Sequence, residues 1–469
     1  MLQEEIIRSF GFAPTAEQIG AINVFCQFMT DRSARTCMLM RGCAGTGKTS
    51  LASAFVATLT RLGFRVMLLA PTGRAAKVFA LNSHHKAFTI HRKIYRQQAF
   101  TGQMTGFNLN DNLLQDTIFM VDEASMISND SSGETTFGSG RLLDDLVNFV
   151  YSGRGCRLML IGDKAQLPPV GEEESPALMA EYLAGYGLTI YQADLNEVLR
   201  QSQESGILYN ATVIRQLVMG QGVASLPRIR FRGFADIHMV PGDELIESLD
   251  SSYSQVGQDE TMVITRSNKR ANIYNQGIRN MVLGREDELC HGDMLLVVRN
   301  NYYWTEQEKS PMAFLANGDR AMVTRARAFR SLYGFRFADV TMRFPDYADY
   351  EMTVTVVLDS LLAEAPALTP AQQEALFQGV MSDYEDIPTK SDRLSRVKSD
   401  VYFNAVQVKY AFAVTCHKAQ GGQWQHVYLD QGYMTDDMLT PDYIHWLYTA
   451  FTRATEKLFL VNWPKTQTE

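Results

Sequence analysis

The sequence predicts an α/β protein built from two parallel-sheet domains and a smaller β-rich insertion. Short apolar runs alternate with helical patterns over residues 1–194, as expected for a parallel sheet covered by helices on both faces. A similar series begins near Leu195 and resumes after residue 404. Between the two pieces, residues 283–404 change to alternating apolar and polar stretches, which are typical of antiparallel strands.

The first series contains four apolar runs that read as buried strands, each followed by Gly, Pro or Asp. They are Thr36–Met40, Arg65–Ala70, Thr117–Val121 and Arg157–Ile161. A helical pattern over Lys48–Leu62 stops at Gly63. Since ligands of such sheets bind at the carboxyl ends of the strands, the residues just after these runs are the candidates for chemistry.

The second series and the insertion divide the rest of the chain. In the second series, strands are expected at Met262–Thr265, Gln407–Val414, His426–Leu429 and Leu458–Val461, with a helix over Asn268–Met281. In the insertion, strands are expected at Met294–Val298, Ala321–Ala326, Phe335–Met342 and Met352–Leu358, with a helix over Thr369–Phe377 that has Pro at its first position. The expected domains are therefore residues 1–194, residues 195–282 with 405–469, and residues 283–404.

Two segments interrupt the first series. Gln97–Asn110 is polar and contains Phe100 and Phe107; a projecting β-hairpin over about residues 95–112 and a plain surface loop are equally compatible with it. Ser128–Gly140 has low complexity and is expected to be a mobile loop.

The composition is that of an ordinary soluble protein, with 46% hydrophobic and 20% charged residues. No apolar run approaches the roughly 20 residues that span a bilayer, and the first residues lack a secretory signal. We therefore expect no membrane association and a cytoplasmic location. The six cysteines form no Cys-x-x-Cys pair, which argues against a zinc site. The net charge of −8 weakly opposes nucleic-acid binding but does not exclude a local basic track.

A phosphate-binding loop follows the first expected strand. Residues 42–49 fit G-x-x-x-x-G-K-[ST], with the strand before and the helix after that the motif requires; they are Gly42, Cys43, Ala44, Gly45, Thr46, Gly47, Lys48 and Thr49. Successive N–H groups of such a loop point at phosphate oxygens. Lys48 is expected to meet the β- and γ-phosphates of ATP, and the Thr49 hydroxyl to ligate Mg²⁺.

Polar residues after the next two strands complete a hydrolysis site. Asp122 and Glu123 follow Thr117–Val121; Asp122 is expected to hold Mg²⁺ and Glu123 to polarise the attacking water. The run from Gly162 to Val170 contains Gln166, which suits a sensor of the γ-phosphate. The sequence thus predicts an ATP hydrolase with magnesium as its cofactor.

Further runs, taken in order with these, resemble the motifs of superfamily 1 DNA helicases, and most closely the RecD/Dda-like branch. They are Pro14–Gln18, Ala70–Ala76, Thr89–His91, Leu195–Gln201, Val263–Asn268, Thr415–Gly422 and Tyr448–Ala454. The resemblance spans nearly the whole chain. It implies two RecA-like domains (1A and 2A) with ATP in the cleft between them, a small 1B insertion at the Gln97–Asn110 segment, and an SH3-like 2B domain at residues 283–404.

The resemblance also assigns residues to the ATP site. Gln18 would read the adenine, and Gly421 would contact the nucleotide from the second domain. Arg200 and Arg453 would reach the γ-phosphate from that domain, where an arginine stabilises charge that develops in the transition state. Where many relatives carry an acidic residue, this chain continues with Gln423 and Trp424.

The resemblance also implies that single-stranded nucleic acid binds across both domains. The residues implied are Pro71, Thr72, Thr89 and His91 from the first domain, and Thr265, Asn268, Thr415 and His417 from the second. Hydroxyl and amide groups suit gripping of phosphates without sequence preference. An aromatic of the 1B segment would stack on the first base pair of a duplex junction.

These implications lead to one leading reading and two alternatives. The leading reading is a monomeric DNA helicase that moves 5′→3′ on single-stranded DNA. The first alternative is a nucleic-acid-stimulated translocase that remodels protein–DNA complexes without unwinding. The second is a regulatory subunit whose ATP site serves assembly, against which Lys48, Glu123, Gln166 and Arg453 speak.

Overall fold

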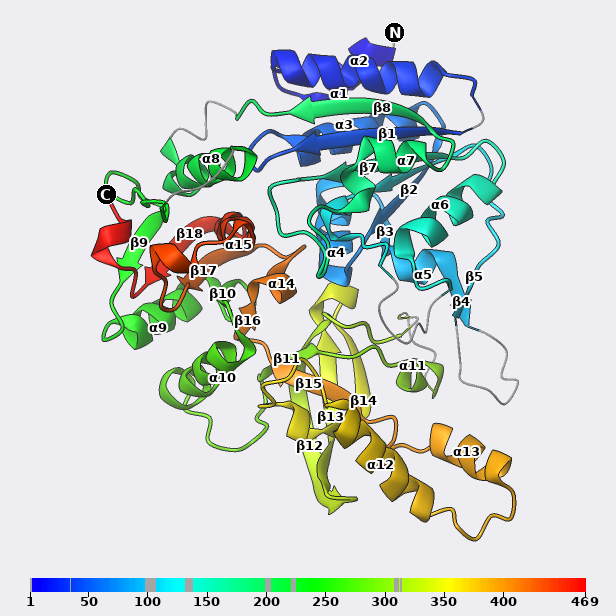
Figure 1. Cartoon of the computed structure of the whole chain (residues 1–469), viewed down its shortest axis with the longest axis vertical. Coiled ribbons are helices and arrows are strands. Elements are labelled where there is room, and N and C mark those ends of the chain that lie inside the picture. Colours follow the sequence, from blue (N-terminus) through cyan, green and yellow to red (C-terminus); the bar gives the residue numbers. More distant parts are fainter. Residues whose placement is uncertain are drawn as a thin grey trace.

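The computed structural model describes residues 2–33, 35–97, 107–130, 138–198, 204–220, 225–307, 312 and 314–469. Two parallel sheets and a closed β-barrel form the framework, with the first sheet at the top of Figure 1 and the barrel at the bottom. The α/β fold class with two RecA-like sheets is confirmed. No helix of the described residues is long and apolar enough to cross a membrane.

The first sheet has six parallel strands in the order β3-β2-β6-β7-β1-β8. Their bounds are β1 (Thr36–Gly42), β2 (Arg65–Ala70), β3 (Ala87–Thr89), β6 (Thr117–Val121), β7 (Arg157–Gly162) and β8 (Thr189–Leu195). Strand β7 lies between β1 and β6. The phosphate loop after β1 and the carboxylates after β6 therefore meet on either side of the β7 end.

Helices cover both faces of this sheet because its strands are apolar on both sides. The helices are α1 (Leu2–Phe10), α2 (Ala16–Thr30), α3 (Lys48–Arg61), α4 (Gly73–Ser83), α5 (Ile90–Ile94), α6 (Leu142–Ser152) and α7 (Ala180–Ala184). In β1, Met38 and Met40 pack in the core under α1–α4, while Cys37 and Leu39 pack in the core with α5–α7. Both sets are fully buried.

The second sheet has five parallel strands in the order β16-β10-β17-β18-β9. Their bounds are β9 (Ile237–Val240), β10 (Thr261–Thr265), β16 (Ala413–Thr415), β17 (Trp424–Asp430) and β18 (Ala454–Val461). The helices of this part are α8 (Gly206–Met219), α9 (Leu245–Val256), α10 (Asn268–Gly277), α14 (Cys416–Ala419) and α15 (Pro441–Phe451), and α10 continues as a π-helical turn over Ile278–Val282.

The β-rich insertion is a closed five-stranded barrel made of β11 (Met294–Val297), β12 (Arg320–Leu332), β13 (Phe335–Phe344), β14 (Tyr350–Val357) and β15 (Val406–Tyr410). The expectation of a single strand over Gln407–Val414 is wrong. That apolar run splits into β15, which pairs with β11 and β14, and β16, which pairs with β10. The domain boundary that was expected between residues 404 and 405 is therefore misplaced, because it cuts β15, the fifth strand, off from the barrel.

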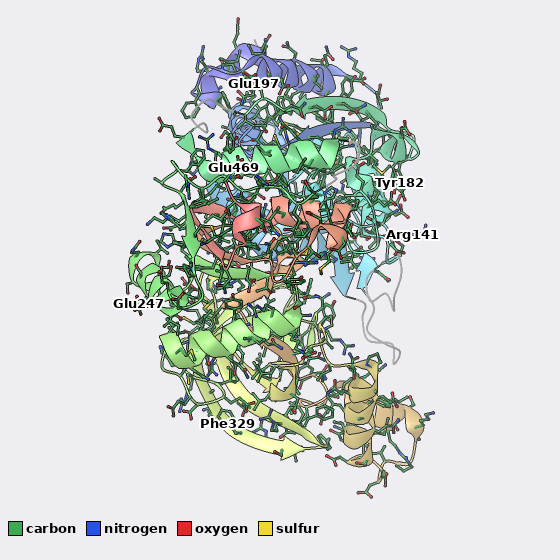
Figure 2. All side chains as sticks on the ribbon, turned by 60° about the vertical axis from the view of Figure 1, so that its left-hand side comes forward. Arg141, Tyr182, Glu197, Glu247, Phe329 and Glu469 are labelled. Atoms are coloured by element: carbon green, nitrogen blue, oxygen red, sulfur yellow. The ribbon has the colours of Figure 1, made fainter. Side chains whose placement is uncertain are left out.

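Three helices accompany the barrel: α11 (Tyr303–Gln307), α12 (Pro370–Ser382) and α13 (Lys390–Lys398). Helix α12 begins where the Thr-Pro signal predicts. The Thr369 side chain accepts the N–H of Gln372, and the Gln372 side chain accepts the N–H of Thr369, which forms a capping box. Figure 2 shows Phe329, in the β12 strand, at the end of the barrel that is far from the two sheets.

The Gln97–Asn110 segment begins and ends in an antiparallel pair, β4 (Tyr95–Gln97) with β5 (Phe107–Leu109). This pairing favours the hairpin over the plain loop. Residues 98–106, with Phe100, lie outside the described residues, as do residues 131–137 of the Ser128–Gly140 segment.

Candidate nucleotide site and nucleic-acid face

The phosphate loop curls at two glycines. Gly45 and Gly47 have φ values of +79° and +80°, a left-handed conformation that glycine adopts without a steric penalty. A Cβ atom on Gly42 would lie 2.9 Å from both Leu195 Cβ and Thr46 Oγ1. The glycines of the motif are thus required by the turn and by close packing.

Lys48 lies inside the loop, where the motif places it. Its Nζ donates hydrogen bonds to the carbonyl oxygens of Gly42 at 2.6 Å and Cys43 at 2.8 Å. The same Nζ lies 4.0 Å from Asp163 Oδ2, after strand β7. The ammonium group is therefore held by the loop's own acceptors.

A tyrosine from the second sheet's domain reaches the loop. The Tyr448 hydroxyl, in α15, accepts the N–H of Ala44 at 2.9 Å and donates to Asp163 Oδ2 at 2.7 Å. Tyr448 is 1% exposed. Burial and the neighbouring Asp163 raise the pKa of Tyr448 well above its usual value, so the phenol is neutral at pH 7.

Asp122 and Glu123 stand at the carboxyl end of β6. Asp122 Oδ1 accepts the N–H of Glu123 at 2.9 Å. Burial, with a smaller contribution from the charge of Glu123, raises the pKa of Asp122 to about 7. Glu123 has a left-handed φ of +53°, a strained conformation for a non-glycine residue that often marks functional sites.

Two side-chain oxygen atoms near the loop, one of Asp122 and one of Thr49, could be ligands of Mg²⁺, which prefers oxygen ligands and keeps several waters. Asp122 Oδ2 and Thr49 Oγ1 have no hydrogen-bond partner within the described part of the chain. Thr49 opens α3 directly after Lys48, and Asp122 ends β6. Both types of donor fit the ion, so Thr49 and Asp122 are the residues that would hold it beside the nucleotide phosphates.

Gln166 lies beyond the carboxyl end of β7, the strand between β1, which leads to the phosphate loop, and β6, which leads to Asp122. It is 7% exposed, and its Oε1 is buried without a hydrogen-bond partner among the described residues. A buried amide oxygen without a partner costs free energy, about 1–3 kcal/mol. This position therefore suits a group that gains a polar partner when a ligand or water enters.

Arg453 follows α15 and is 2% exposed. Its Nη1 lies 4.0 Å from Glu123 Oε1 of the first sheet and 3.1 Å from the carbonyl oxygen of Gly422. Its Nε donates to the carbonyl oxygen of Thr449 at 3.0 Å. The structure thus brings Arg453 to the first-sheet carboxylates, whereas Arg200 lies outside the described residues.

Gln18 and Gly421 lie near the loop and near the junction of the sheets, respectively. The Gln18 side chain is 1% exposed; its Oε1 accepts the N–H of Thr15 at 2.9 Å and its Nε2 donates to the carbonyl oxygen of Thr46 at 2.9 Å. Gly421 has a φ of +71°, and a Cβ there would lie 2.9 Å from Thr72 Oγ1. Gln18 therefore braces the loop, and Gly421 contacts the first-sheet domain.

The first-sheet residues implied for nucleic acid cluster at two helix starts. Thr72 and Thr89 are the N-caps of α4 and α5, and their hydroxyls accept the N–H groups of Ala75 and Arg92. Pro71 precedes Thr72 and is partly buried. His91 is half-buried with its ring 6.4 Å from that of Phe314. Burial lowers the pKa of His91 to about 4, so its ring is neutral at pH 7.

In the second sheet's domain, three of the four implied residues share one cavity. Asn268, Thr415 and His417 line a cavity of about 460 Å³ together with Arg266 and Ser267. Thr265 is not among them. It is fully buried and its hydroxyl donates to the carbonyl oxygen of Ser267 at 3.1 Å, so the implied contact of Thr265 with nucleic acid is not supported by its position.

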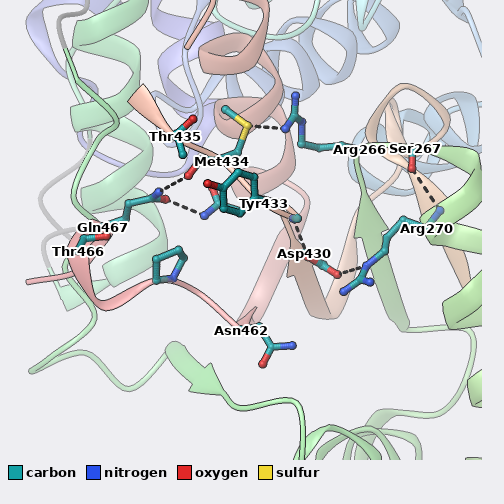
Figure 3. A pocket seen from close by; sticks show the side chains of 13 residues that line it. Arg266, Ser267, Arg270, Asp430, Tyr433, Met434, Thr435, Asn462, Thr466 and Gln467 are labelled. Carbon is teal, nitrogen blue, oxygen red and sulfur yellow. Dashed lines mark hydrogen bonds and ion pairs between the residues drawn. The ribbon is translucent and has the colours of Figure 1, made fainter. Parts of the chain in front are cut away.

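A larger cavity of about 870 Å³ adjoins this one and shares Arg266 and Ser267 with it (Figure 3). It lies at the carboxyl ends of β10, β17 and β18. Arg270 Nε pairs with Asp430 Oδ2 at 2.7 Å, and Arg266 contacts the sulfur of Met434 (Figure 3). Its lining includes Tyr433, whose side chain is 81% exposed.

Tyr448 and Asp163 are two site residues that the sequence did not predict. Both lie inside runs that were recognised, Tyr448–Ala454 and Gly162–Val170, but nothing in either run indicates that the two side chains meet at the phosphate loop.

A phosphate loop at the carboxyl edge of one RecA-like sheet, with a second parallel sheet beside it, defines the class of this protein as a two-domain P-loop fold. Residues 15–227 match the family model described as AAA domain. Residues 410–461 match the family model described as UvrD-like helicase C-terminal domain.

Two curated relatives match parts of the chain. It is 24% identical over 295 residues to the ATP-dependent DNA helicase dda of enterobacteria phage T4, covering 60% of each chain. It is 31% identical over 175 residues to the ATP-dependent RecD2 DNA helicase of Deinococcus radiodurans, covering 37% of this chain and 21% of the relative. The chain thus matches less than two thirds of either relative's length. These matches confirm that it is related to the superfamily 1 helicases.

Solved structures of Pif1 helicases are also similar. A Bacteroides Pif1 in complex with ADP-AlF3 and ssDNA has 15% identity and a TM-score of 0.48, covering 97% of this chain and 94% of that one. Candida albicans Pif1 has 16% identity and a TM-score of 0.40, covering 97% and 96%.

Proposed function

We propose that this chain is an ATP-dependent DNA helicase that moves 5′→3′ on single-stranded DNA and couples Mg-ATP hydrolysis to duplex unwinding. The observation that carries this proposal is the 4.0 Å approach of Arg453 Nη1, from the second sheet's domain, to Glu123 of the first. When an arginine from another domain is needed for hydrolysis, the reaction depends on closure of the cleft. Each cycle of ATP turnover then drives the two domains together and apart.

In this proposal the nucleotide site divides its work among the residues around the loop. Lys48 and the loop N–H groups hold the phosphates, while Thr49 and Asp122 hold Mg²⁺, which neutralises charge on the phosphates. Glu123 orients the attacking water, Gln166 contacts the γ-phosphate, and Gln18 reads the adenine. Arg453, with Arg200, stabilises the charge of the transition state, and Gly421 approaches the nucleotide when the cleft closes.

The DNA strand crosses the carboxyl edges of both sheets. It contacts Pro71, Thr72, Thr89 and His91 on the first and Asn268, Thr415 and His417 on the second. Thr265 does not contact the strand in this proposal; its buried hydroxyl donates to the carbonyl oxygen of Ser267 and holds the turn before Asn268. The names of the phage T4 and Deinococcus relatives, both ATP-dependent DNA helicases, support DNA as the substrate. We further propose that the chain acts as a cytoplasmic monomer at junctions of single-stranded and duplex DNA.

Forked DNA with either a 5′ or a 3′ single-stranded tail, labelled with a fluorophore and a quencher, tests this function. We expect ATP-dependent unwinding with the 5′ tail alone, and no unwinding by Lys48→Ala. Unwinding with the 3′ tail alone would contradict the polarity. DNA-stimulated ATPase without unwinding of either fork would indicate a translocase that remodels protein–DNA complexes, and ATPase indifferent to DNA would overturn both readings.

A further inference from the structure

Two phosphate-binding groups of the loop, the N–H of Ala44 and the ammonium of Lys48, are already engaged by the protein itself. The N–H of Ala44 is bonded to the Tyr448 hydroxyl, and Lys48 Nζ is bonded to the carbonyl oxygens of Gly42 and Cys43. In a nucleotide-bound P-loop, the N–H groups and the lysine serve phosphate oxygens instead. ATP and these internal partners therefore compete for the same donors.

Tyr448 belongs to one face of α15 that docks on the first sheet's domain. His445 and Thr449 share this face, three residues before and one residue after it. The Thr449 Oγ1 accepts the N–H of Leu167 at 2.7 Å, and the His445 Nδ1 lies 3.0 Å from the carbonyl oxygen of Ala165. All three residues thus contact the segment after β7, Tyr448 through Asp163, and Tyr448 in addition contacts the phosphate loop at Ala44.

The tyrosine contact is the one that a nucleotide would break. A phosphate oxygen is charged, so it accepts an N–H more strongly than a neutral phenol does. The Tyr448 phenol is neutral because burial and Asp163 raise its pKa. The contacts of His445 and Thr449 involve no group of the phosphate loop, so they can persist as a pivot when Tyr448 leaves.

We propose that Tyr448 is a positioning residue of the ATP site, whose hydroxyl takes the place of a phosphate oxygen on Ala44 until ATP displaces it. Displacement frees one contact of α15 with the first domain. Because Arg453 follows the end of α15, movement of this helix repositions the arginine toward the nucleotide. Tyr448 thereby links occupancy of the phosphate loop to the placement of Arg453. This inference rests on the proposed ATP site.

The test compares Tyr448→Phe with Tyr443→Phe. Tyr443 lies on the same helix, is also buried, and its hydroxyl bonds to Gln431 rather than to the loop. The probe is a fluorescent, non-hydrolysable ATP analogue with Mg²⁺, titrated without DNA. Since ATP would no longer have to break the hydroxyl's bonds, we expect Tyr448→Phe to bind about three- to tenfold more tightly than wild type. Tyr443→Phe should bind within about twofold of wild type. Unchanged or weaker binding by Tyr448→Phe would overturn the proposal.

Thermal unfolding gives an independent readout. If the contact exists only without nucleotide, Tyr448→Phe lowers the Tm of the free chain but leaves the Tm at saturating analogue equal to that of wild type. An equal loss in both states would overturn the proposal, because the contact would then persist with nucleotide bound. If neither the wild type nor Tyr448→Phe binds the analogue, the proposed ATP function fails and this inference fails with it. A failure to unwind DNA with analogue binding intact would reject only the helicase function.

Discussion

Arg453 is almost completely buried, at 2% exposure, although it carries a full positive charge. The carbonyl oxygens of Thr449 and Gly422 accept two of its hydrogen bonds, and Glu123 lies 4.0 Å away. Burying a charge costs free energy unless partners compensate it. The Arg453 Nη2 also donates to Thr452 Oγ1 at 3.1 Å, so all three nitrogens have acceptors and the guanidinium is held in one orientation beside Glu123.

At the residue scale we predict that Arg453→Ala abolishes ATP turnover but spares ATP binding. An arginine supplied across a cleft acts on the charge of the transition state, and its loss lowers kcat by about 10³- to 10⁵-fold in comparable enzymes. The measurement is a steady-state ATPase assay with saturating single-stranded DNA, beside an analogue-binding titration.

The control for this substitution is Arg327→Ala. Arg327 is exposed on β12 and makes no ion pair within the described residues, so its loss should leave turnover unchanged. A wild-type rate in Arg453→Ala would refute the assignment of this arginine to the cleft. Arg453→Lys, which keeps the charge but loses the fork of donors, should stay close to the alanine variant.

At the scale of elements, the barrel docks on the start of α4. Asp319 precedes β12 and is 3% exposed; it accepts the N–H of Ala316 at 2.7 Å and the hydroxyl of Tyr347 at 3.0 Å. A Cβ on Gly73 would lie 2.8 Å from the Tyr347 oxygen, so the barrel and the helix touch here. Lys77 of α4 donates to the carbonyl oxygen of Pro345 at 2.9 Å. The residues implied for nucleic acid at Thr72 and His91 lie beside this contact.

Asp319 should make the stability of this junction depend on pH. Burial raises the pKa of Asp319 to about 7, from about 3.8 for an exposed carboxyl. The folded chain therefore holds a proton that the unfolded chain releases between pH 4 and 7. The contribution of Asp319 to stability is fully present below pH 4 and is lost as the pH rises toward 7, at about 1.4 kcal/mol per pH unit or less.

We predict that Asp319→Asn reduces the loss of Tm between pH 5 and pH 8. The absolute Tm falls as well, because an amide has one acceptor oxygen, whereas both oxygens of Asp319 accept a hydrogen bond. Asp386→Asn, at an exposed position near the end of α12, should leave the difference between the two pH values as in wild type. Parallel pH profiles for wild type and Asp319→Asn would show that Asp319 does not titrate in this range.

At the scale of the whole molecule, the two sheets meet where Gly421 lies against Thr72. The Gly421 φ of +71° favours glycine, and a Cβ would come within 2.9 Å of Thr72 Oγ1 and 3.2 Å of Ala75 Cβ. The same segment continues to Gly422, which holds Arg453. The distance between the sheets at this point thus sets how closely Arg453 approaches Glu123.

We predict that Gly421→Ala lowers kcat for ATP hydrolysis by at least about tenfold, because the added methyl group holds the domains apart. Gly63→Ala is a matched control, since Gly63 has a φ of +80° and nothing within 4 Å of an added Cβ. Both substitutions carry the strain of a left-handed alanine, about 1–2 kcal/mol, so Gly63→Ala controls for the part of any effect that comes from backbone strain. Equal ATPase rates in the two variants would contradict the role of this contact in closure.

Local patterns predicted much of the fold. The strands at Arg65–Ala70 and Thr117–Val121 have the bounds expected from their apolar runs, because a buried strand needs apolar side chains on both faces and a turn residue at its end. The phosphate loop is equally local, since its conformation depends on glycines at fixed spacing. For these elements the information lies within a few consecutive residues.

Short runs of residues are thus enough to predict the kind of chemistry, because the phosphate loop, the carboxylate pair and the motifs that follow them in order are each local in the sequence. Tertiary structure decided which groups meet. Val406–Tyr410 joined the barrel and not the sheet, because strand pairing depends on distant partners. Thr265 became buried, although its motif implied a surface contact. Tyr448 reached Ala44 across 404 residues of chain, a contact made by the packing of two domains, which no local pattern encodes.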